Sequence, residues 1–327
     1  MLETTITKMF NIRYPIIQGG LQGLGTSSLV AAVSNAGGLG LITAGSYSSK
    51  EEMLRDIEAT RRLTLEPFGV NITIGVRKPM DEFVEGVIEA EIPVVFTSGN
   101  NPEKYIDLFK RHNIKVVHVV PSIRFAKKAE KLGCDAVVVV GFECGGHPGK
   151  DEVTSLILVQ KAVQQLSIPV IAAGGFSTGK SMLAAFALGA QAIQMGTRFL
   201  ATKEVQLHSL LKSRLLQLQE TDTIIVKKSI GKPARVMKTD VAIKLAKLEE
   251  NGASFEEIFP FISGEAYQEL ISTSNDNRGV LALGQTVGLV NEIKSVQEVI
   301  QEVITEYEIQ LQSLANHFKN TTCSDRV

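Results

Sequence analysis

The segment Ala136-Val137-Val138-Val139-Val140-Gly141-Phe142-Glu143-Cys144-Gly145-Gly146-His147-Pro148-Gly149 joins a β-branched run to a cluster of glycines. The five residues at its start predict a buried strand, because continuous runs of Val are typical of parallel sheets. The glycines are costly, since glycine loses more conformational freedom on folding than any other residue. Two interpretations stay open. The segment is either a tight strand-to-helix turn or a backbone lying flat against a bound ring, with His147 facing the reacting atoms.

The same alternation of a short apolar run with a longer amphipathic run recurs between residues 14 and 196. The apolar runs predict strands at Tyr14–Gln18, Leu39–Thr43, Phe68–Ile74, Val94–Ser98, Lys115–Val120, Ala136–Val140, Pro169–Ala173 and Ala192–Gly196. The amphipathic runs predict helices at Ser27–Asn35, Lys50–Arg62, Met80–Ala90, Pro102–His112, Ser122–Leu132, Thr154–Gln165 and Gly179–Leu188. Repeated strand–helix units predict an α/β protein with a parallel sheet, which closes into a (β/α)8 TIM barrel. A doubly wound open sheet is the alternative.

This rhythm stops after residue 204. Residues 205–280 read as largely helical and polar, without strand–helix alternation, and a last amphipathic helix is expected from about Gln285 to His317. We therefore expect a barrel made of residues 1–204 plus 281–327. Residues 205–280 would form a smaller helical lid or substrate domain over one mouth of the barrel.

The composition excludes several classes of partner. The chain has 327 residues, with 34 Lys and Arg against 35 Asp and Glu, so no nucleic acid or anionic membrane surface is expected as a partner. No apolar run is long enough to span a bilayer, and the start of the chain lacks a signal-peptide core. Its three cysteines form no CxxC motif. A cytoplasmic protein with reduced thiols is the resulting expectation.

Glycines, amides and hydroxyls follow the predicted strands on the side where barrels carry their active sites. The candidate cofactor-binding residues are Gln18, Gly19, Gly20, Asn71, Gly145, Gly146, Gly174, Gly175, Gln194, Met195, Gly196 and Thr197. The turns after strands seven and eight each open a helix, which predicts a phosphate pocket with free backbone N–H groups. A phosphate combined with the glycines after strands one and six indicates FMN. A nicotinamide or PLP fits less well, because no GxGxxG motif follows a strand and no lysine stands alone at a strand end.

His147 is the candidate catalytic residue. Its neighbours are glycines and Pro148, which offer no bulky packing, and an imidazole with an ordinary pKa of about 6.5 suits proton transfer. His118 lies within a predicted strand and is expected to be hydrogen-bonded in the barrel. Cys144 is expected to be a small apolar filler of the turn. No pair of histidines has metal-ligand spacing, so no metal is expected.

Six motifs, in chain order, resemble one known family: Pro15–Gly20, Ala36–Gly40, Phe68–Asn71, Glu143–His147, Ala172–Gly175 and Gln194–Phe199. They resemble the nitronate monooxygenase (2-nitropropane dioxygenase-like) family, and the resemblance covers residues 10–204. It implies an FMN barrel in which Asn71, Gly145, Gly174, Gly175 and Gln194–Thr197 hold the flavin. It also implies that His147 lies near the flavin N5.

The resemblance implies three related activities. The first expectation is oxidation of alkyl nitronates with O2. The second is NADH:quinone reduction, with NADH as co-substrate, and the third is FMN-dependent enoyl-acyl-carrier-protein reduction. Residues 143–152 with Gly99–Pro102 look most like the quinone reductases, although Arg77 stands where these tend to place Gln. Val119–Ser122 resembles the enoyl reductases, and Val140 stands where many monooxygenases place a flavin-contacting Gln.

A flavin-binding module without turnover is the alternative from another class. A homodimer is one oligomeric state that the sequence allows.

Overall fold

The computed structural model describes residues 2–75, 79–275 and 277–322, with side-chain surroundings up to residue 317. Arg77 and Cys323 lie outside the described residues. The strands of the main sheet are β1 (Ile16–Gln18), β2 (Gly40–Thr43), β3 (Phe68–Ile74), β4 (Val94–Gly99), β5 (Lys115–Val120), β6 (Ala136–Val140), β7 (Val170–Ala173) and β8 (Ala192–Met195). All eight are parallel, in the order β1-β8-β7-β6-β5-β4-β3-β2. A parallel bridge between Ile17 and Leu39 joins β1 to β2 and closes the ring, which confirms the predicted (β/α)8 barrel.

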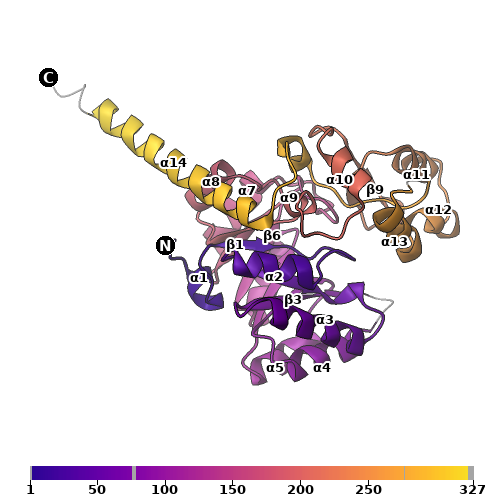
Figure 1. The fold of residues 1–327 in the computed structure, drawn as a ribbon, viewed down its shortest axis with the longest axis horizontal. Helices are drawn as coiled ribbons and strands as arrows, with labels where there is room; N and C mark the ends of the chain where they lie inside the picture. The colour runs from indigo at the N-terminus through magenta and orange to yellow at the C-terminus, as the bar shows by residue number, and fades with distance from the viewer. Residues whose placement is uncertain (1, 76–78, 276, 323–327) are drawn as a thin grey trace.

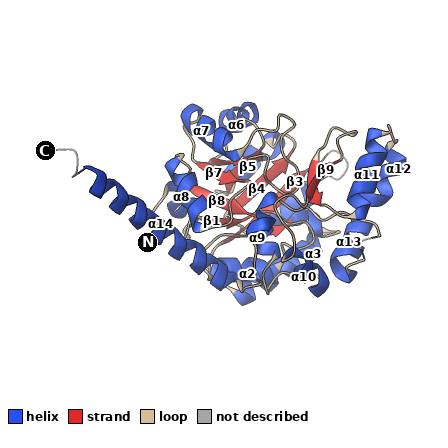
Figure 2. Ribbon diagram, turned by 90° about the horizontal axis from the view of Figure 1, so that it is seen from above, coloured by secondary structure: helices blue, strands red, loops and turns tan. Residues whose placement is uncertain are grey.

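Helices alternate with these strands on the outside of the barrel (Figure 2). They are α2 (Ser27–Asn35), α3 (Lys50–Leu63), α4 (Asp81–Glu89), α5 (Glu103–Arg111), α6 (Ile123–Lys131), α7 (Ser155–Gln165) and α8 (Gly179–Ala187). Each lies within two residues of the predicted range at either end. The short helix α9 (Thr197–Leu200) follows β8, where the turn after strand eight was expected to open a helix, but the sequence patterns did not predict the short helix α1 (Thr5–Phe10) or the 3-10 turn at Ala44–Ser46.

Apolar side chains fill the barrel interior, and α1 closes one end of it. Ile17, Leu41, Phe96 and the inward-facing residues of β5 to β8 form one buried cluster with Ile6 and Phe10 of α1. The rings of Phe10 and Phe96 lie 5.9 Å apart between centroids. The other face of each strand packs in a second, larger cluster against the outer helices. The barrel is therefore a packed core, and ligands are restricted to its open end.

The chain between β8 and the last helix forms a lobe beside the barrel mouth (Figures 1 and 2). Its elements are α10 (Ser209–Leu215), β9 (Thr223–Val226), β10 (Ala234–Met237), α11 (Asp240–Glu250), α12 (Phe255–Ile262) and α13 (Gly264–Thr273). The region is largely helical, as expected, but it also contains an antiparallel hairpin of β9 and β10 that the sequence patterns did not predict. Each strand has only four residues, which is too short for the alternation that marks a strand in sequence.

The lobe has a small core of its own, which includes Val226, Val236, Leu245 and Ile258. In contrast, α10 packs into the main barrel core through Leu211 and Leu215. The buried residues of this separate core lie between residues 226 and 258, a shorter range than the predicted lid. The predicted domain boundaries at residues 205 and 280 remain a prediction.

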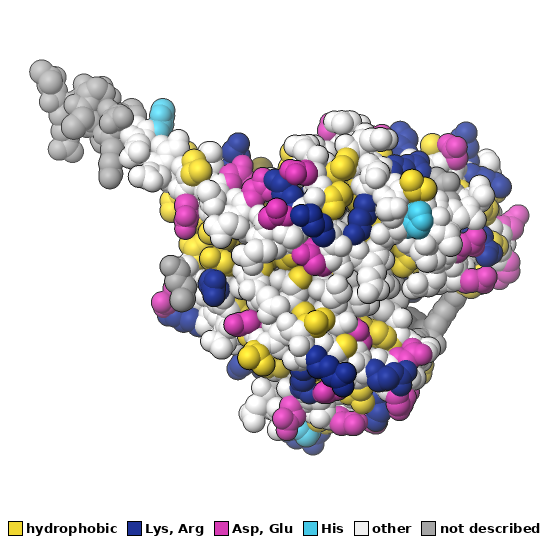
Figure 3. Space-filling view, viewed as in Figure 1, with side chains coloured by type: hydrophobic (Ala, Val, Ile, Leu, Met, Phe, Trp, Pro, Cys, Tyr) yellow, Lys and Arg dark blue, Asp and Glu magenta, His cyan; other side chains and the backbone are white. Residues whose placement is uncertain are grey.

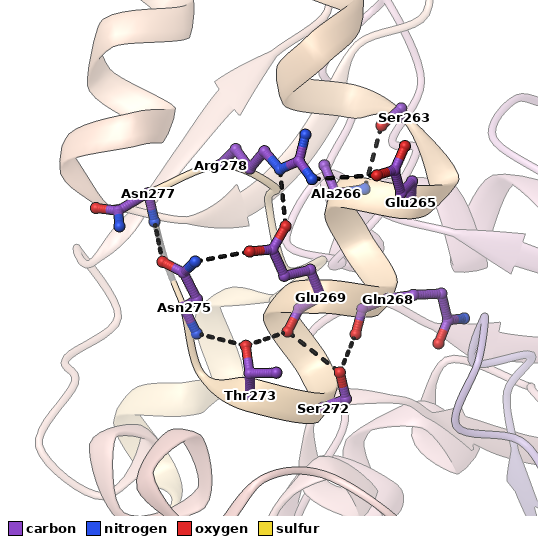
Figure 4. A network of polar contacts seen from close by, with 10 residues as sticks. All are labelled: Ser263, Glu265, Ala266, Gln268, Glu269, Ser272, Thr273, Asn275, Asn277 and Arg278. Carbon is purple, nitrogen blue, oxygen red and sulfur yellow. Dashed lines mark hydrogen bonds and ion pairs between the residues drawn. The ribbon is translucent and has the colours of Figure 1, made fainter.

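A polar network joins the end of α13 to the segment that returns to the barrel (Figure 4). Arg278 Nε donates to Glu269 Oε2 at 2.7 Å, and its Nη2 donates to Glu265 Oε1 at 3.2 Å. Asn275 Nδ2 donates to the other oxygen of Glu269 at 2.7 Å. Exposed ion pairs of this kind contribute little free energy. Their effect is to fix the direction in which the chain leaves α13.

The last helix, α14 (Val296–Thr322), begins eleven residues later than the expected Gln285, after a 3-10 turn at Gln285–Leu289. It packs along α8 and α2 and then extends well beyond the barrel (Figure 1). Glu306 Oε2 accepts a hydrogen bond from the Gly179 N–H at 2.7 Å, and the rings of Phe186 and Tyr307 meet edge to face. These contacts join the last helix to the seventh strand–helix unit, which consists of β7 and α8.

His118 is a buried strand residue, as expected, and 5% of it is exposed. Its Nδ1 lies 2.8 Å from Thr97 Oγ1. Burial lowers the pKa of this imidazole to about 4, and a hydrogen bond with the Thr97 backbone opposes the shift. The neutral ring is therefore the native form across the physiological pH range.

We expect His118 to make the protein less stable in mild acid. The unfolded chain binds a proton at His118 below pH 6.5 and the folded chain only below about pH 4, so stability falls as the pH falls between these values. Relative to a His118→Gln variant, the wild-type free energy of unfolding should fall by about 2–3 kcal/mol from pH 7 to pH 4.5. Urea unfolding at both pH values measures this difference, and an identical pH dependence in both proteins would contradict it.

A candidate active site at the barrel mouth

Two side-chain amides flank the loop that follows β1: Asn71 is buried and Gln194 is partly buried. Asn71, from β3, donates from Nδ2 to the Phe96 carbonyl at 3.1 Å and is 5% exposed. Gln194 comes from β8 and lies against Gly19, where an added Cβ would be 3.2 Å from its Nε2. At Gly20 an added Cβ would overlap the Asn71 side-chain oxygen and lie 2.6 Å from Cγ. The missing side chains of the Gly19-Gly20 pair are therefore what allows both amides to reach this rim.

Three buried side-chain oxygens at this end of the barrel lack a hydrogen-bond partner among the described residues: Thr26 Oγ1, Ser177 Oγ and Gln194 Oε1. Each costs free energy unless a partner arrives, because a buried polar atom without a partner pays its desolvation penalty uncompensated. Gln194 lies on the rim, and Ser177 lies two residues beyond the Gly174-Gly175 pair that follows β7. Amide and hydroxyl groups suit the edge and phosphate of a flavin nucleotide, so the residues present fit FMN.

The loop after β6 contains glycines with different roles. A Cβ at Gly145 would lie 2.7 Å from the Gly284 backbone nitrogen, so Gly145 allows the return segment to pack against this loop. Gly146 has a φ of +82°, and a Cβ there would meet nothing within 4 Å. Gly145 is therefore needed for internal packing, and Gly146 leaves open space at the mouth.

Glu143 and Cys144 of the same loop are structural. The Glu143 carboxylate accepts hydrogen bonds from the Ser155 backbone N–H and hydroxyl, and thereby caps α7. Burial raises the pKa of the Cys144 thiol to about 12, which makes it inert as a nucleophile and consistent with the expected apolar filler.

Arg235, on β10, holds the β6–α7 loop against the lobe. Its backbone forms an antiparallel bridge with Gly146, and its guanidinium donates to the Phe142 carbonyl from Nε at 3.3 Å and from Nη2 at 3.1 Å. The guanidinium carbon also lies 4.6 Å from the centre of the Phe142 ring. Arg235 could not be recognised from the sequence, because nothing in a basic residue of a short strand indicates which loop it will contact.

His147 projects from this loop toward the β9–β10 turn. Its Nε2 lies 3.1 Å from Lys227 Nζ. The residue is exposed to solvent, yet protein packed around its ring and the positive charges of Lys227 and Lys232 lower the pKa of the imidazole to about 4. Burial, with Lys232 nearby, likewise lowers the pKa of Lys227. At neutral pH the site therefore contains an uncharged imidazole beside Lys227 and Lys232.

The turn between β7 and α8 differs from the expectation in one respect. Thr178 caps α8 by accepting from the Ser181 N–H, but the Gly179 N–H is already bonded to Glu306. The N–H groups of Ser177 and Thr178 are also bonded, both to the Ser181 hydroxyl, so the start of α8 lacks most of the free N–H groups expected there. The groups that remain for a phosphate come from the Gly174–Phe176 turn, the Ser177 hydroxyl and the turn at Gly196 before α9.

Three further candidates already make internal contacts. Gln18 accepts from the Leu41 N–H at 2.9 Å and donates to the Gly19 carbonyl, so its amide joins β1 to β2. Met195 packs its side chain in the outer core, and its carbonyl accepts from the Gly19 N–H. Thr197 Oγ1 accepts from the Gly284 N–H at 2.9 Å. Their roles as cofactor ligands remain predictions.

A cavity of about 620 Å³ lies where the hairpin, α11 and the β6–α7 loop meet, and Phe142, Arg235 and Gln285 are among the residues that line it. Because barrel and lobe both contribute, a movement of the lobe would change its shape. Within the described ranges, no group of three or more His, Cys, Asp or Glu side chains is arranged to hold a metal ion.

A family model for nitronate monooxygenase matches residues 3–306 of the chain. The chain belongs to the nitronate monooxygenase family. It is 36% identical over 276 residues to a probable nitronate monooxygenase of Staphylococcus aureus strain JH9, a match that covers 71% of this chain and 78% of the relative. As a member of this family of flavoproteins, the protein is an oxidoreductase.

Solved structures extend the comparison to the lobe. The chain is similar to FabK from Thermotoga maritima, with a TM-score of 0.90 and 39% identity over 97% of this chain and 100% of the other. A nitroalkane oxidase from Streptomyces ansochromogenes has a TM-score of 0.81 over 94% of this chain and 99% of the other. At 23% identity that likeness concerns the fold alone.

The surface is of mixed charge. Acidic and basic side chains of the described residues are interspersed on the face shown in Figure 3, in line with the formal net charge of −1. None of the helices in the described part of the chain is both long and apolar enough to cross a membrane.

Proposed function

We propose that this protein is an FMN-dependent oxidoreductase that oxidises alkyl nitronates, with O2 as the electron acceptor. The observation that carries the proposal is the uncharged His147 with Lys227 and Lys232 beside it at the barrel mouth. A nitronate is an anion, and an uncharged N–H donor backed by positive charge favours an anionic oxygen over a neutral or cationic group. Membership of the family and the similarity to the Staphylococcus protein support the same reaction.

FMN, when bound, would take an electron pair from the substrate and pass it to O2. We assign Asn71 and Gln194 to the edge of its ring, because Gln194 Oε1 is buried without a partner and Asn71 shares its rim. The phosphate is assigned to the Gly174–Ser177 and Gly196–Thr197 turns, where Ser177 Oγ also lacks a partner. His147 would orient the nitronate oxygen.

Anaerobic mixing tests this proposal. Protein purified with FMN should be yellow, and its absorbance near 450 nm should bleach on mixing with ethylnitronate or propionate 3-nitronate, because the substrate supplies the electrons. NADH serves as the matched alternative donor. Bleaching by NADH and not by either nitronate would overturn the monooxygenase assignment, and protein that stays colourless after incubation with FMN would overturn the flavin assignment.

A reductase on the same flavin is the second candidate. It is favoured by the similarity to FabK over nearly the whole chain and by Val119–Ser122, which resembles the FMN-dependent enoyl reductases. This candidate predicts bleaching by NADH, followed by reoxidation on addition of an enoyl thioester or a quinone. The reoxidant that restores the yellow colour would distinguish the enoyl and quinone reductases.

A further inference from the structure

Lys227 is the side chain that contacts the candidate catalytic histidine, and the sequence motifs did not indicate it. It lies directly after β9, in the turn that leads to β10, eighty residues from His147 in sequence. Its Nζ is 3.1 Å from Nε2 of His147. The contact therefore depends on the hairpin being placed over the β6–α7 loop, which the Gly146–Arg235 bridge achieves.

The backbone of Lys227 is held in an unusual conformation. Its φ is +65°, in the left-handed region that residues other than glycine seldom occupy. Glu249 of α11 accepts from the Lys227 N–H at 2.6 Å and from the Ser229 N–H and hydroxyl. Strained backbone conformations of this kind persist where surrounding contacts hold them in place, and they are frequent at functional sites. Here α11 fixes the turn, and the turn directs the lysine toward His147.

The contact determines where His147 carries its proton. An ammonium has three donors and no acceptor, so Lys227 donates and Nε2 must accept. An imidazole that accepts at Nε2 is neutral and carries its hydrogen on Nδ1. The charged groups that act on it are Lys227 and Lys232, from one turn, while Glu249 acts on Lys227 through the backbone and lowers the net positive charge there.

We propose that Lys227 is a positioning residue of this active site: it fixes His147 as the neutral Nδ1–H tautomer and supplies the positive charge behind it. The substrate then meets the Nδ1–H donor of His147, while Nε2 of the same ring accepts a hydrogen bond from the Lys227 ammonium. This arrangement favours an anionic oxygen on the substrate. The choice of nitronate as that anion rests on the proposed function. The tautomer of His147 and its dependence on Lys227 do not rest on the proposed function.

Nitrogen-15 NMR of the histidines in the oxidised FMN-loaded protein tests the tautomer directly, with His147 assigned by its disappearance in a His147→Asn variant. In the wild type we expect protonated Nδ1 and unprotonated Nε2, with no titration of His147 between pH 5.5 and 8. In Lys227→Met we expect a shift toward the Nε2–H tautomer and a titration that moves up into this range. Wild-type protein with protonated Nε2 would overturn the proposal without any variant.

Two matched variants serve as controls. Lys228→Met removes the neighbouring charge from the same turn and should leave the tautomer unchanged, while Lys227→Arg should keep it. The proposal would be contradicted if Lys227→Met kept the wild-type tautomer and titration of His147. It would also be contradicted if Lys228→Met shifted the tautomer and titration as Lys227→Met is expected to do.

A kinetic measurement connects the pair to substrate. In Lys227→Met, kcat/KM for ethylnitronate should fall at least 10-fold, mainly through KM, and Lys227→Arg should recover most of it. An unchanged KM would refute the anion-selecting role. If the wild type does not react with nitronates at all, the proposed function fails, and the NMR result still decides the role of Lys227.

Discussion

Replacement of His147 by asparagine is expected to slow reduction of the bound flavin by a nitronate about 10²–10⁴-fold, the usual contribution of a positioned acid–base or hydrogen-bonding group. The flavin itself should stay bound, because the groups assigned to it are Asn71, Gln194 and the glycine turns. Stability should change little, since His147 is exposed and its described side-chain hydrogen bond is the one to Lys227. Anaerobic stopped-flow measurement of bleaching at 450 nm gives the rate, and absorbance of the purified variant gives the flavin content.

His112 provides the matched control. It ends α5 at the surface, outside the barrel mouth, so His112→Asn should leave both the rate and the flavin content unchanged. Wild-type rates in His147→Asn would make that histidine structural. Loss of flavin together with rate would instead make His147 part of the cofactor site.

Most of the barrel could be predicted from the sequence because its signals are local. A run such as Ala136–Val140 becomes a strand wherever it is buried on both faces, and helix starts carry their own caps, as Thr178 does for α8. The eight repeats then leave few topologies, since parallel strands need right-handed crossovers. Helix α1 was not predicted because six residues hold too little periodicity, although Ile6 and Phe10 fill the end of the barrel.

The candidate site was predictable only in part, because its geometry depends on contacts between distant segments. Glycine pairs after several strands indicated the correct rim, but the sequence could not show that Gly145 packs on Gly284. Nor could it show that Glu306, 127 residues away, bonds the start of α8. Lys227 and Arg235 were missed for the same reason: they reach the mouth through a hairpin whose pairing is non-local.

The other large effect is expected from Gly20→Ala. The added methyl group would overlap the Asn71 side-chain oxygen and lie 2.6 Å from Cγ, and Asn71 is buried and bonded to the Phe96 carbonyl. To relieve the overlap, the amide must leave that hydrogen bond or the loop after β1 must shift. Overpacking of this kind costs about 1–3 kcal/mol of stability. Because the amide is assigned to the flavin ring, FMN affinity should fall at least 10-fold, measured by titrating the apoprotein with FMN.

Gly264→Ala is the control for the substitution itself. A Cβ at Gly264, the first residue of α13, would meet nothing within 4 Å, so FMN affinity should be that of the wild type. A double-mutant cycle with Asn71→Ala then tests the cause. If the methyl group acts through the Asn71 amide, Gly20→Ala should weaken binding much less once that amide is gone, because the two changes share one contact. Additive losses would show that the loop acts on the flavin independently of Asn71, and wild-type affinity in Gly20→Ala would remove this rim from the cofactor site.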